Sequence, residues 1–162
     1  MRVQDIKSGS VDIGAIELFI SPETSSALGR SILEPGDVLV SIAGTIGRTG
    51  IVPADAPELN CNQAVALIRT GDGISPAYLQ AWLGTMPAER QMRGANVTGT
   101  ISNLSLTSIR NLLLPVPSAA EQLAFEERLN QFQGEQARAE SSAAAMEDLF
   151  ASIQQRVFRG EL

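Results

Sequence analysis

Apolar side chains recur at alternating intervals of four and three residues along the last quarter of the chain. The stretch 118–158 contains no proline and one glycine, and a capping box of Ser118 and Glu121 directly follows Pro117. The pattern predicts one helix over 118–158 that carries a heptad seam. The seam positions are Phe125, Leu129, Phe132, Gln136, Ala139, Ala143, Met146, Phe150, Ile153 and Val157.

A helix of this length cannot bury its apolar seam against one small domain. At 1.5 Å per residue, about 40 residues make a rod of about 60 Å, so the seam predicts a second helix alongside, from another copy or a partner. The alternative is an amphipathic helix that folds back onto its own domain. The residues predicted to form a dimer contact are Phe125, Leu129, Phe132, Ala139, Ala143, Met146, Phe150, Ile153 and Val157.

The preceding part of the chain has the turn signals and β-branched runs of a β-rich domain. Residues 5–13 read as strand, turn and strand. The turn Pro35-Gly36-Asp37 leads into a buried strand over 38–43. The glycine-rich loop 44–50 joins that strand to a short one that follows it. A further strand is predicted over 62–68.

Short helices are predicted in the second half of this domain. Ser75 is an N-cap residue and Pro76 occupies the first helical position, followed by apolar residues at helical spacing. Leu104, Leu106 and Ile109 predict another short helix. The apolar run 112–117 is interpreted as an edge strand that closes the domain.

These elements predict an α+β fold in two parts. A β-rich domain spans 1–117, and a long coiled-coil-forming α-helix spans 118–162. The chain has 162 residues, of which 44% are hydrophobic and 19% charged. This composition is typical of a globular protein that is long enough to bury a core without disulfides or metal.

The composition excludes several kinds of site. There is no histidine, and Cys61 is the single cysteine. A structural zinc site, a Ser-His or Cys-His nucleophile pair and an internal disulfide are therefore excluded. We expect no active site, no metal and no cofactor. No apolar run reaches about 18 residues and the N-terminus lacks an apolar signal core, so we expect a cytoplasmic protein.

The charge is acidic and unevenly distributed. The net charge is −6, which argues against a surface that grips nucleic acid everywhere. Residues 1–116 carry eight Arg and Lys against ten Asp and Glu, whereas residues 117–162 carry four against eight. Eleven of the twelve cations are arginine, the side chain better suited to bidentate contacts with phosphate or guanine.

A series of short motifs runs in order along nearly the whole chain. The motifs are Pro35-Gly36-Asp37-Val38-Leu39-Val40-Ser41, Gly44-Thr45-Ile46-Gly47-Arg48, Asn62-Gln63-Ala64-Val65, Ser75-Pro76-x-Tyr78-Leu79, Gly99-Thr100-Ile101, Leu114-Pro115-Val116-Pro117, Glu121-Gln122 and the C-terminal Leu149-Phe150-x-Ser152-Ile153-Gln154-x-Arg156-Val157-Phe158-x-Gly160-Glu161-Leu162. This ordered set resembles one half of the specificity (S) subunit of a type I restriction–modification system.

The resemblance implies a non-catalytic protein that recognises double-stranded DNA. The family's subunit carries two target recognition domains, each followed by a long helix, and the two helices pair antiparallel. Methyltransferase (M) subunits, which use S-adenosylmethionine, dock on it, and a motor-nuclease (R) subunit can join them. With one domain and one helix, this chain is expected to be a half subunit that forms a homodimer and reads an interrupted palindrome. The segment 2–6 resembles a strand found some way into the family's domain, so a shortened domain is expected.

Two polar loops are the candidate DNA-facing segments. The loop 44–50 is not a P-loop, because no Gly-Lys-Ser/Thr follows it. It is either a tight hairpin or a DNA contact through Thr45, Arg48 and Thr49. The segment 96–103 is either a solvated loop or a second DNA-facing loop. Its candidate residues are Asn96, Thr98, Thr100 and Asn103.

Four further cations are candidate DNA contacts. Arg90 and Arg93 lie just before the second loop, where they either form a solvated helix end or contact phosphate. Lys7 and Arg30 lie in or beside predicted turns, which commonly carry side chains that read bases.

Three functions from different classes remain open at this point. The first is a DNA-recognition module that scaffolds methyltransferase subunits. The second is a truncated structural or assembly protein that dimerises through its helix without binding DNA, which the acidic charge favours. The third is an enzyme with a glycine-loop site for a phosphorylated ligand, which the missing histidine and loop lysine disfavour.

Overall fold

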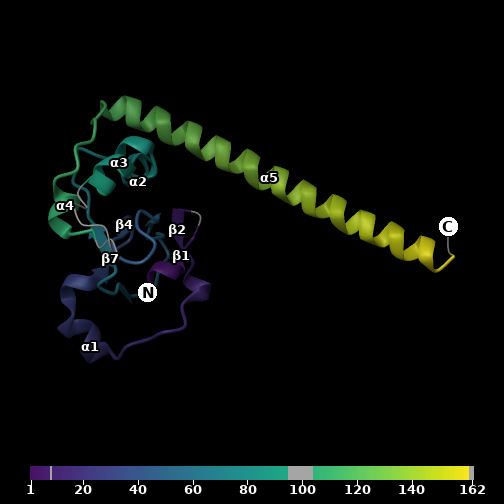
Figure 1. The fold of residues 1–162 in the computed structure, drawn as a ribbon, viewed down its shortest axis with the longest axis horizontal. Helices are drawn as coiled ribbons and strands as arrows, with labels where there is room; N and C mark the ends of the chain where they lie inside the picture. The colour runs from purple at the N-terminus through teal and green to yellow at the C-terminus, as the bar shows by residue number, and fades with distance from the viewer. Residues whose placement is uncertain (8, 95–103, 161–162) are drawn as a thin grey trace. The chain divides into compact units, whose positions relative to one another are not determined.

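A computed structural model of the chain describes every residue except 8, 95–103 and 161–162. The chain divides into two compact units, residues 1–122 and residues 123–162. The first unit contains the strands and the short helices, and the second is a single helix (Figure 1). The α+β fold class expected from the sequence is confirmed. Among the described residues, none of the helices has both the length and the hydropathy that a membrane span requires.

The first unit is built on a five-stranded sheet in the order β1-β2-β5-β4-β7. Its pairs are antiparallel except β2 with β5, which run parallel. A second sheet pairs β3 with β6. The strands are β1 (Ile6–Lys7), β2 (Gly9–Val11), β3 (Ile32–Leu33), β4 (Val38–Ser41), β5 (Thr49–Ile51), β6 (Leu59–Asn60) and β7 (Val65–Ile68).

Strand β4 is buried on both faces and divides the core in two. Its alternating side chains point to opposite faces, as the period of two of a strand requires. One cluster lies on the side covered by helices: Val38, Val40, Ile42, Ala66, Leu79, Trp82, Leu83, Ala88, Met92 and Leu104. The other contains Met1, Ile6, Val11, Leu33, Leu39, Val52, Leu59 and Val65.

The helices begin where capping residues stand in the sequence. Ser75 accepts a hydrogen bond from the Tyr78 N–H at 3.0 Å, and Ser105 accepts one from the Ser108 N–H at 3.0 Å. Both predicted short helices are therefore confirmed. The helices are α1 (Pro22–Ala27), α2 (Pro76–Leu83), α3 (Met86–Gly94), α4 (Leu106–Arg110) and α5 (Ala119–Phe158), with 3₁₀ turns η1 (Val3–Asp5), η2 (Ile13–Ala15) and η3 (Gly29–Ser31).

The prediction of an edge strand over 112–117 is wrong, because this segment has no regular secondary structure. Its backbone bonds to a side chain instead of to a strand. The Gln91 side chain accepts the Leu113 N–H and donates to the Leu113 carbonyl, both at 2.8 Å. Pro115 and Pro117 have no N–H to give to a sheet. The apolar content therefore reflects packing: Leu112 and Leu114 lie against the helix-side cluster.

The parallel pairing of β2 with β5 depends on a close approach at Gly50. Gly50 lies opposite Gly9 in the register. A Cβ atom on Gly50 would lie 2.9 Å from Ile6 Cγ2 and 3.1 Å from the Ser10 carbonyl oxygen. Any larger residue would push β2 away, so glycine is the residue that lets the N-terminal hairpin join the sheet.

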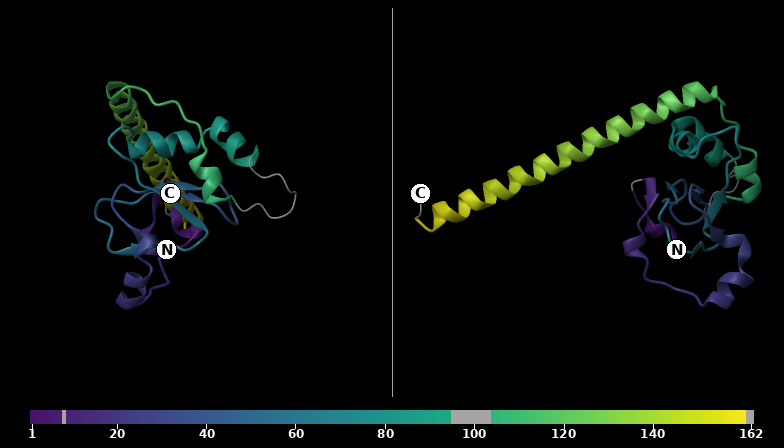
Figure 2. Two further views of the ribbon diagram at one scale, coloured as in Figure 1. Left: turned by 90° about the vertical axis from the view of Figure 1, so that its left-hand side faces the viewer. Right: turned by 180° about the vertical axis from the view of Figure 1, so that it is seen from behind.

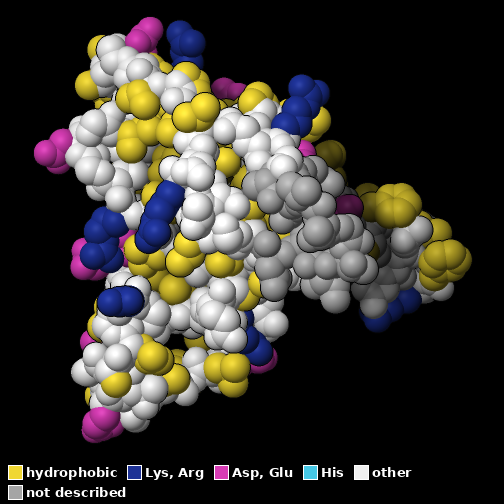
Figure 3. All heavy atoms as spheres, turned by 60° about the vertical axis from the view of Figure 1, so that its left-hand side comes forward, with side chains coloured by type: hydrophobic (Ala, Val, Ile, Leu, Met, Phe, Trp, Pro, Cys, Tyr) yellow, Lys and Arg dark blue, Asp and Glu magenta, His cyan; other side chains and the backbone are white. Residues whose placement is uncertain are grey.

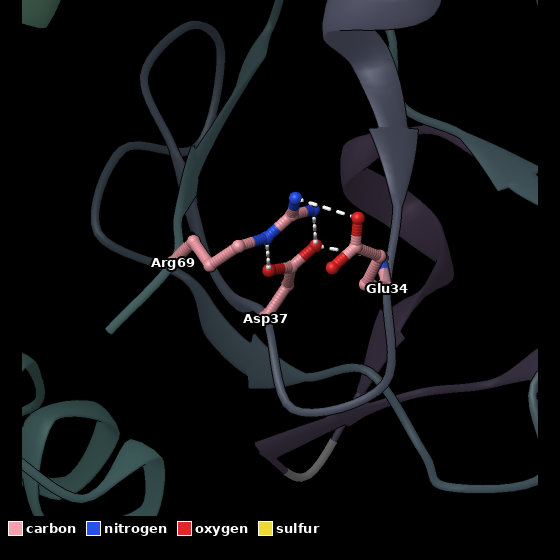
Figure 4. A network of polar contacts seen from close by, with 3 residues as sticks. All are labelled: Glu34, Asp37 and Arg69. Carbon is pink, nitrogen blue, oxygen red and sulfur yellow. Dashed lines mark hydrogen bonds and ion pairs between the residues drawn. The ribbon is translucent and has the colours of Figure 1, made fainter. Parts of the chain in front are cut away.

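A buried carboxylate holds the turn before β4 (Figure 4). The Asp37 side chain is 1% exposed and pairs with the Arg69 guanidinium through two bonds of 2.8 Å. It also accepts the Glu34 N–H at 2.6 Å, while the exposed Glu34 carboxylate lies 2.7 Å from Arg69 Nη1. The hydrogen-bonded Asp37 carboxylate raises the pKa of Arg69. These bonds join the turn to the end of β7.

Helix α5 is continuous for 40 residues (Figure 2), and Gly134 does not interrupt it. The capping box is formed as predicted: Ser118 N–H donates to the Glu121 carboxylate at 2.9 Å. Gln122, in the first turn, is 5% exposed. Its amide accepts the Ser75 N–H at 2.8 Å and donates to the carbonyls of Gly73 and Pro117. The helix start is thus fixed within the first unit.

Candidate nucleic-acid interface

The loop between β4 and β5 is held at both ends by Ser41, whose side chain is fully buried. The Ser41 hydroxyl donates to the Thr45 carbonyl and accepts the Arg48 N–H at 2.8 Å. The Ser41 backbone bonds to Arg48 and Gly47. Gly44 and Gly47 have φ values of 72° and 82°, which side chains other than glycine rarely adopt. Strands β4 and β5 thus form an antiparallel hairpin with a tight, internally bonded loop.

Replacing Ser41 by alanine is expected to lower the free energy of unfolding by about 1–2 kcal/mol, because the Arg48 N–H and the Thr45 carbonyl lose their partner. Urea unfolding with an unchanged m-value would measure this loss. Ser10→Ala is the matched control, since that exposed hydroxyl makes only a 3.5 Å contact to the Ile51 carbonyl. Equal midpoints for both variants would show that Ser41 does not hold the loop.

A shallow concavity of about 390 Å³ lies beside this loop. It is formed where the loop meets η1 and the segment that precedes β7. The lining residues are Arg2, Val3, Gln4, Ala43, Gly44, Thr45, Arg48, Asn62 and Ala64. Three segments that are distant in the sequence thus present backbone and polar groups to one site.

The three candidate residues of the loop have different environments. Thr45 is exposed and lines the concavity. Arg48 also lines it, and its Nη1 donates over 3.5 Å to the Val3 carbonyl. It has no carboxylate partner among the described residues. The hydroxyl of Thr49 is instead engaged inside the domain, because it accepts a bond of 3.1 Å from Gln80 of α2. Thr45 and Arg48 are therefore better placed for a ligand than Thr49.

Lys7, the last residue of β1, lies at the same end of the sheet as this loop. Gly9, which starts β2, is opposite Gly50 in the parallel β5, and the loop precedes β5. Lys7 forms an exposed ion pair of 2.9 Å with Asp12, and the Lys7 hydrogen bond lowers the pKa of Asp12. Any anionic ligand would therefore have to compete with Asp12 for the Lys7 ammonium group.

The other candidate arginines lie on separate elements. Arg30 is exposed in η3, next to the small sheet, and the described residues show it no contact with the β4–β5 loop. Arg90 is exposed on α3, and this helix approaches the loop: a Cβ on Gly47 would lie 3.7 Å from Met92 Cε. Arg93 is also on α3, but its side chain lies outside the described part of the chain.

The second predicted loop lies outside the described residues, and so do its four candidates, Asn96, Thr98, Thr100 and Asn103. Its two flanking residues are described. Gly94 ends α3, and the Leu104 N–H donates to the Ile42 carbonyl at 2.8 Å. Ile42 directly follows β4 and precedes the β4–β5 loop. Leu104 therefore lies beside the end of β4 at which the β4–β5 loop starts.

Seven of the nine lining residues, including Arg2 and Asn62, were not among the sequence candidates. Arg2 precedes the first 3₁₀ turn, and no local pattern connects it with a loop more than 40 positions away. Asn62 could have been found, because it begins the segment predicted as a strand, whose residues Val65–Ile68 form β7 beside β4. In an antiparallel pair the start of one strand lies beside the end of the other, and Val65 is opposite Ser41.

On one face of the molecule, the described cations do not form a continuous patch. On the face drawn in Figure 3, Lys and Arg side chains stand in separate groups among polar and hydrophobic ones. No group of three or more His, Cys, Asp or Glu among the described residues could hold a metal ion. Burial raises the pKa of the Cys61 thiol, so the free cysteine is not an activated nucleophile. The arrangement offers hydrogen bonds and local positive charge to a ligand.

The predicted dimer contacts lie along one stripe of α5. Within the unit 123–162 there is no second element among the described residues on which this stripe could pack. Phe125 and Leu129, near the start of the helix, are half-buried. Met146 and Phe150 are 65% and 62% exposed. The exposed members of the stripe also include Ala139, Ala143, Ile153 and Val157, and Phe132 is 63% exposed.

Comparisons with known proteins connect this chain with one class of protein. No family model matches. The type I restriction enzyme EcoBI specificity subunit of Escherichia coli is 31% identical over 169 aligned positions, which cover 100% of this chain and 35% of that subunit. The chain thus spans about a third of this curated relative's length.

Two solved structures share the fold. A structure from work on complex assembly and conformational transition of the type I R-M system has a TM-score of 0.61 at 24% identity, and covers 82% of this chain and 33% of that one. The crystal structure of the HsdS subunit from Thermoanaerobacter tengcongensis has a TM-score of 0.55 at 23% identity, with coverage of 81% and 31%. The resemblance found from the ordered motifs is confirmed: over its whole length, this chain is homologous to a part of the specificity subunit of type I restriction enzymes.

Proposed function

We propose that this chain is a DNA-recognition module that binds one half of a bipartite target within a type I restriction–modification complex. The observation that carries the proposal is the homology of the whole chain to a type I specificity subunit. The chain itself is not the enzyme. Catalysis belongs to methyltransferase subunits, for which the chain is a scaffold, and to a motor-nuclease subunit where one joins the complex.

The end of the sheet at the β4–β5 loop is the proposed DNA-facing edge of the domain. The positions of Thr45, Arg48 and Lys7 support this proposal, as do those of Gly94 and Leu104, which flank the segment 95–103. Arg48 would contact phosphate, which orients the domain without selecting a sequence. Base recognition is proposed for the polar residues Asn96, Thr98, Thr100 and Asn103, because amide and hydroxyl groups can form hydrogen bonds with base edges.

The remaining candidates have more peripheral roles in this proposal. Arg90 and Arg93 of α3 would contact the DNA backbone next to the second loop. Arg30 lies on η3, beside the other sheet, and would contact DNA only if the duplex extends that far. Thr49 would act indirectly, because its hydroxyl already bonds to Gln80.

Helix α5 is proposed to pair with the α5 of a second copy in antiparallel orientation. The exposed apolar stripe supports this pairing, because a stripe of this kind is stable when another helix covers it. Two identical domains would then read the two halves of an interrupted palindrome. At 1.5 Å per residue, the 40 residues of the helix would set the separation of the half sites at the scale of about 60 Å or less.

Arg48→Ala is expected to weaken binding to all duplex sequences by a similar factor, because a phosphate contact carries no sequence information. The slope of log K against log salt should fall by no more than about 0.9. Fluorescence anisotropy with several duplexes at a series of salt concentrations measures both quantities. Arg110→Ala, an exposed arginine of α4 that does not line the concavity, is the control.

Failure of the parent protein to retain any duplex at low salt, with and without a methyltransferase subunit, would contradict the proposal. In that case the chain would be an assembly protein that pairs through its helix and leaves DNA to other subunits. The acidic net charge of −6 is the observation that favours this second function.

A further inference from the structure

Two guanidinium groups and no carboxylate group line the concavity beside the β4–β5 loop, among the described residues. Arg2 and Arg48 both line it, and they come from segments more than 40 residues apart. None of the described residues that line it is an aspartate or glutamate. Since residues 1–116 carry more acidic than basic side chains, this local excess of positive charge differs from the average of the domain.

Neither arginine is fully engaged in the free protein. Arg48 makes one long contact of 3.5 Å to the Val3 carbonyl. Arg2 shares one terminal nitrogen with the exposed Glu17 at 3.3 Å, and its buried Nε has no hydrogen-bond partner among the described residues. An exposed ion pair of this length contributes little to stability, so Arg2 can exchange Glu17 for a stronger acceptor at small cost.

Asn62 and Gly44 add an uncharged hydrogen-bond donor and an open stretch of backbone to the concavity. The Asn62 side-chain oxygen accepts the Ala64 N–H at 3.2 Å, which leaves the NH₂ group as a donor with no partner among the described residues. Gly44 has a positive φ, and a Cβ atom added there would meet nothing within 4 Å, so the backbone is open to a ligand at this point. A concavity lined by guanidinium and amide donors suits a small oxyanion.

We infer that this concavity binds one backbone phosphate of duplex DNA through Arg2, Arg48 and Asn62 acting together. The inference rests on the proposed DNA-recognition function and adds Arg2 and Asn62 to its contacts. Guanidinium forks match phosphate oxygens in geometry as well as charge. A phosphate bound at this point would fix the domain's register on the duplex next to the β4–β5 loop, while other residues read the bases.

The test compares Arg2→Gln, Arg48→Gln and the double variant in the full-length chain, by anisotropy with one duplex over a range of salt concentrations. Each single variant should bind about tenfold more weakly at low salt, because a charge-assisted hydrogen bond is lost. The double variant should lower the salt slope by about 0.9, the value for one shared phosphate. Two separate phosphates would give about 1.8. Arg2→Lys, which keeps the charge, should retain most of the slope.

Arg110→Gln is the matched control and should keep the parent slope, and thermal unfolding midpoints would show that every variant is folded. If Arg2→Gln does not fold, Asn62→Ala removes the third donor and takes its place. If the parent binds duplex DNA but the variants keep its affinity and slope, this inference is overturned and the proposed function stands. If the parent binds no duplex, both fail. A further experiment titrates the parent and Arg2→Gln with inorganic phosphate in the absence of DNA. Binding of phosphate that Arg2→Gln weakens, together with an unchanged salt slope for duplex binding in that variant, would identify a site for free phosphate and overturn the inference.

Discussion

Replacing Met146 and Ile153 together by glutamate is expected to convert the dimer proposed above into a monomer. Both side chains are exposed on the apolar stripe of α5, at 65% and 42%, and they lie seven residues apart on one face. In an antiparallel pair the double substitution would place four carboxylates in the contact. Burying charges without partners should weaken association by roughly a hundredfold or more. Sedimentation equilibrium or light scattering over a concentration series measures the change.

A matched control is available on the same helix. Ser152→Glu with Gln155→Glu adds the same two charges outside the seam, and this variant should remain dimeric. Circular dichroism should show helix content in both variants, since glutamate is a good helix former. An equal monomer mass for the parent and both variants would contradict pairing through the helix. A dimer that survives in Met146→Glu/Ile153→Glu would place the contact elsewhere.

Replacing Asp37 by alanine is expected to lower the free energy of unfolding by about 3 kcal/mol, because it breaks a buried pair while leaving one partner in place. The Asp37 carboxylate is 1% exposed and serves two groups at once, the Arg69 guanidinium and the Glu34 N–H. Without it, the turn that leads into the central strand β4 loses its anchor at the end of β7. Because Arg69 itself is 46% exposed, water can partly solvate it in the variant. Chemical unfolding followed by tryptophan fluorescence measures the loss, since Trp82 lies in the core.

Glu34→Gln provides the comparison for this substitution. The Glu34 carboxylate is exposed and contacts the same guanidinium at 2.7 Å, so its removal should cost less than about 1 kcal/mol. A similar loss in both variants would mean that Asp37 contributes no more than a surface ion pair, and that burial does not distinguish the two carboxylates. A loss confined to Asp37→Ala would support its role as the anchor of the turn.

Local patterns predicted helices α2, α4 and α5, whereas α1 was not predicted. The continuous helix α5, its capping box and the Ser75-Pro76 start of α2 all follow from residues within a few positions of one another. The ordered motifs also predicted homology to a type I specificity subunit, because they occur in the same order along nearly the whole chain. Strand positions in the central hairpin followed from the glycine-rich loop and the β-branched runs on either side.

The prediction over 112–117 was wrong because an apolar run has no period that separates a strand from an extended segment packed on helices. The bonds that decide the matter come from Gln91, which is 22 positions away from Leu113. The parallel register of β2 with β5 likewise depends on Gly50 meeting Ile6 and Ser10. Neither contact leaves a signal in the local sequence.

By itself, the sequence determined the long helix with its apolar stripe, the α+β class and the resemblance to part of a type I specificity subunit, since these depend on periodicity, capping and motif order along the chain. Only the tertiary structure decided which cations share a site. Arg2 and Arg48 meet at one concavity because η1 packs beside the β4–β5 loop, and Thr49 turns to Gln80 because α2 covers that strand. Such contacts join residues that are far apart in sequence, and their energies come from shape and burial in the folded domain.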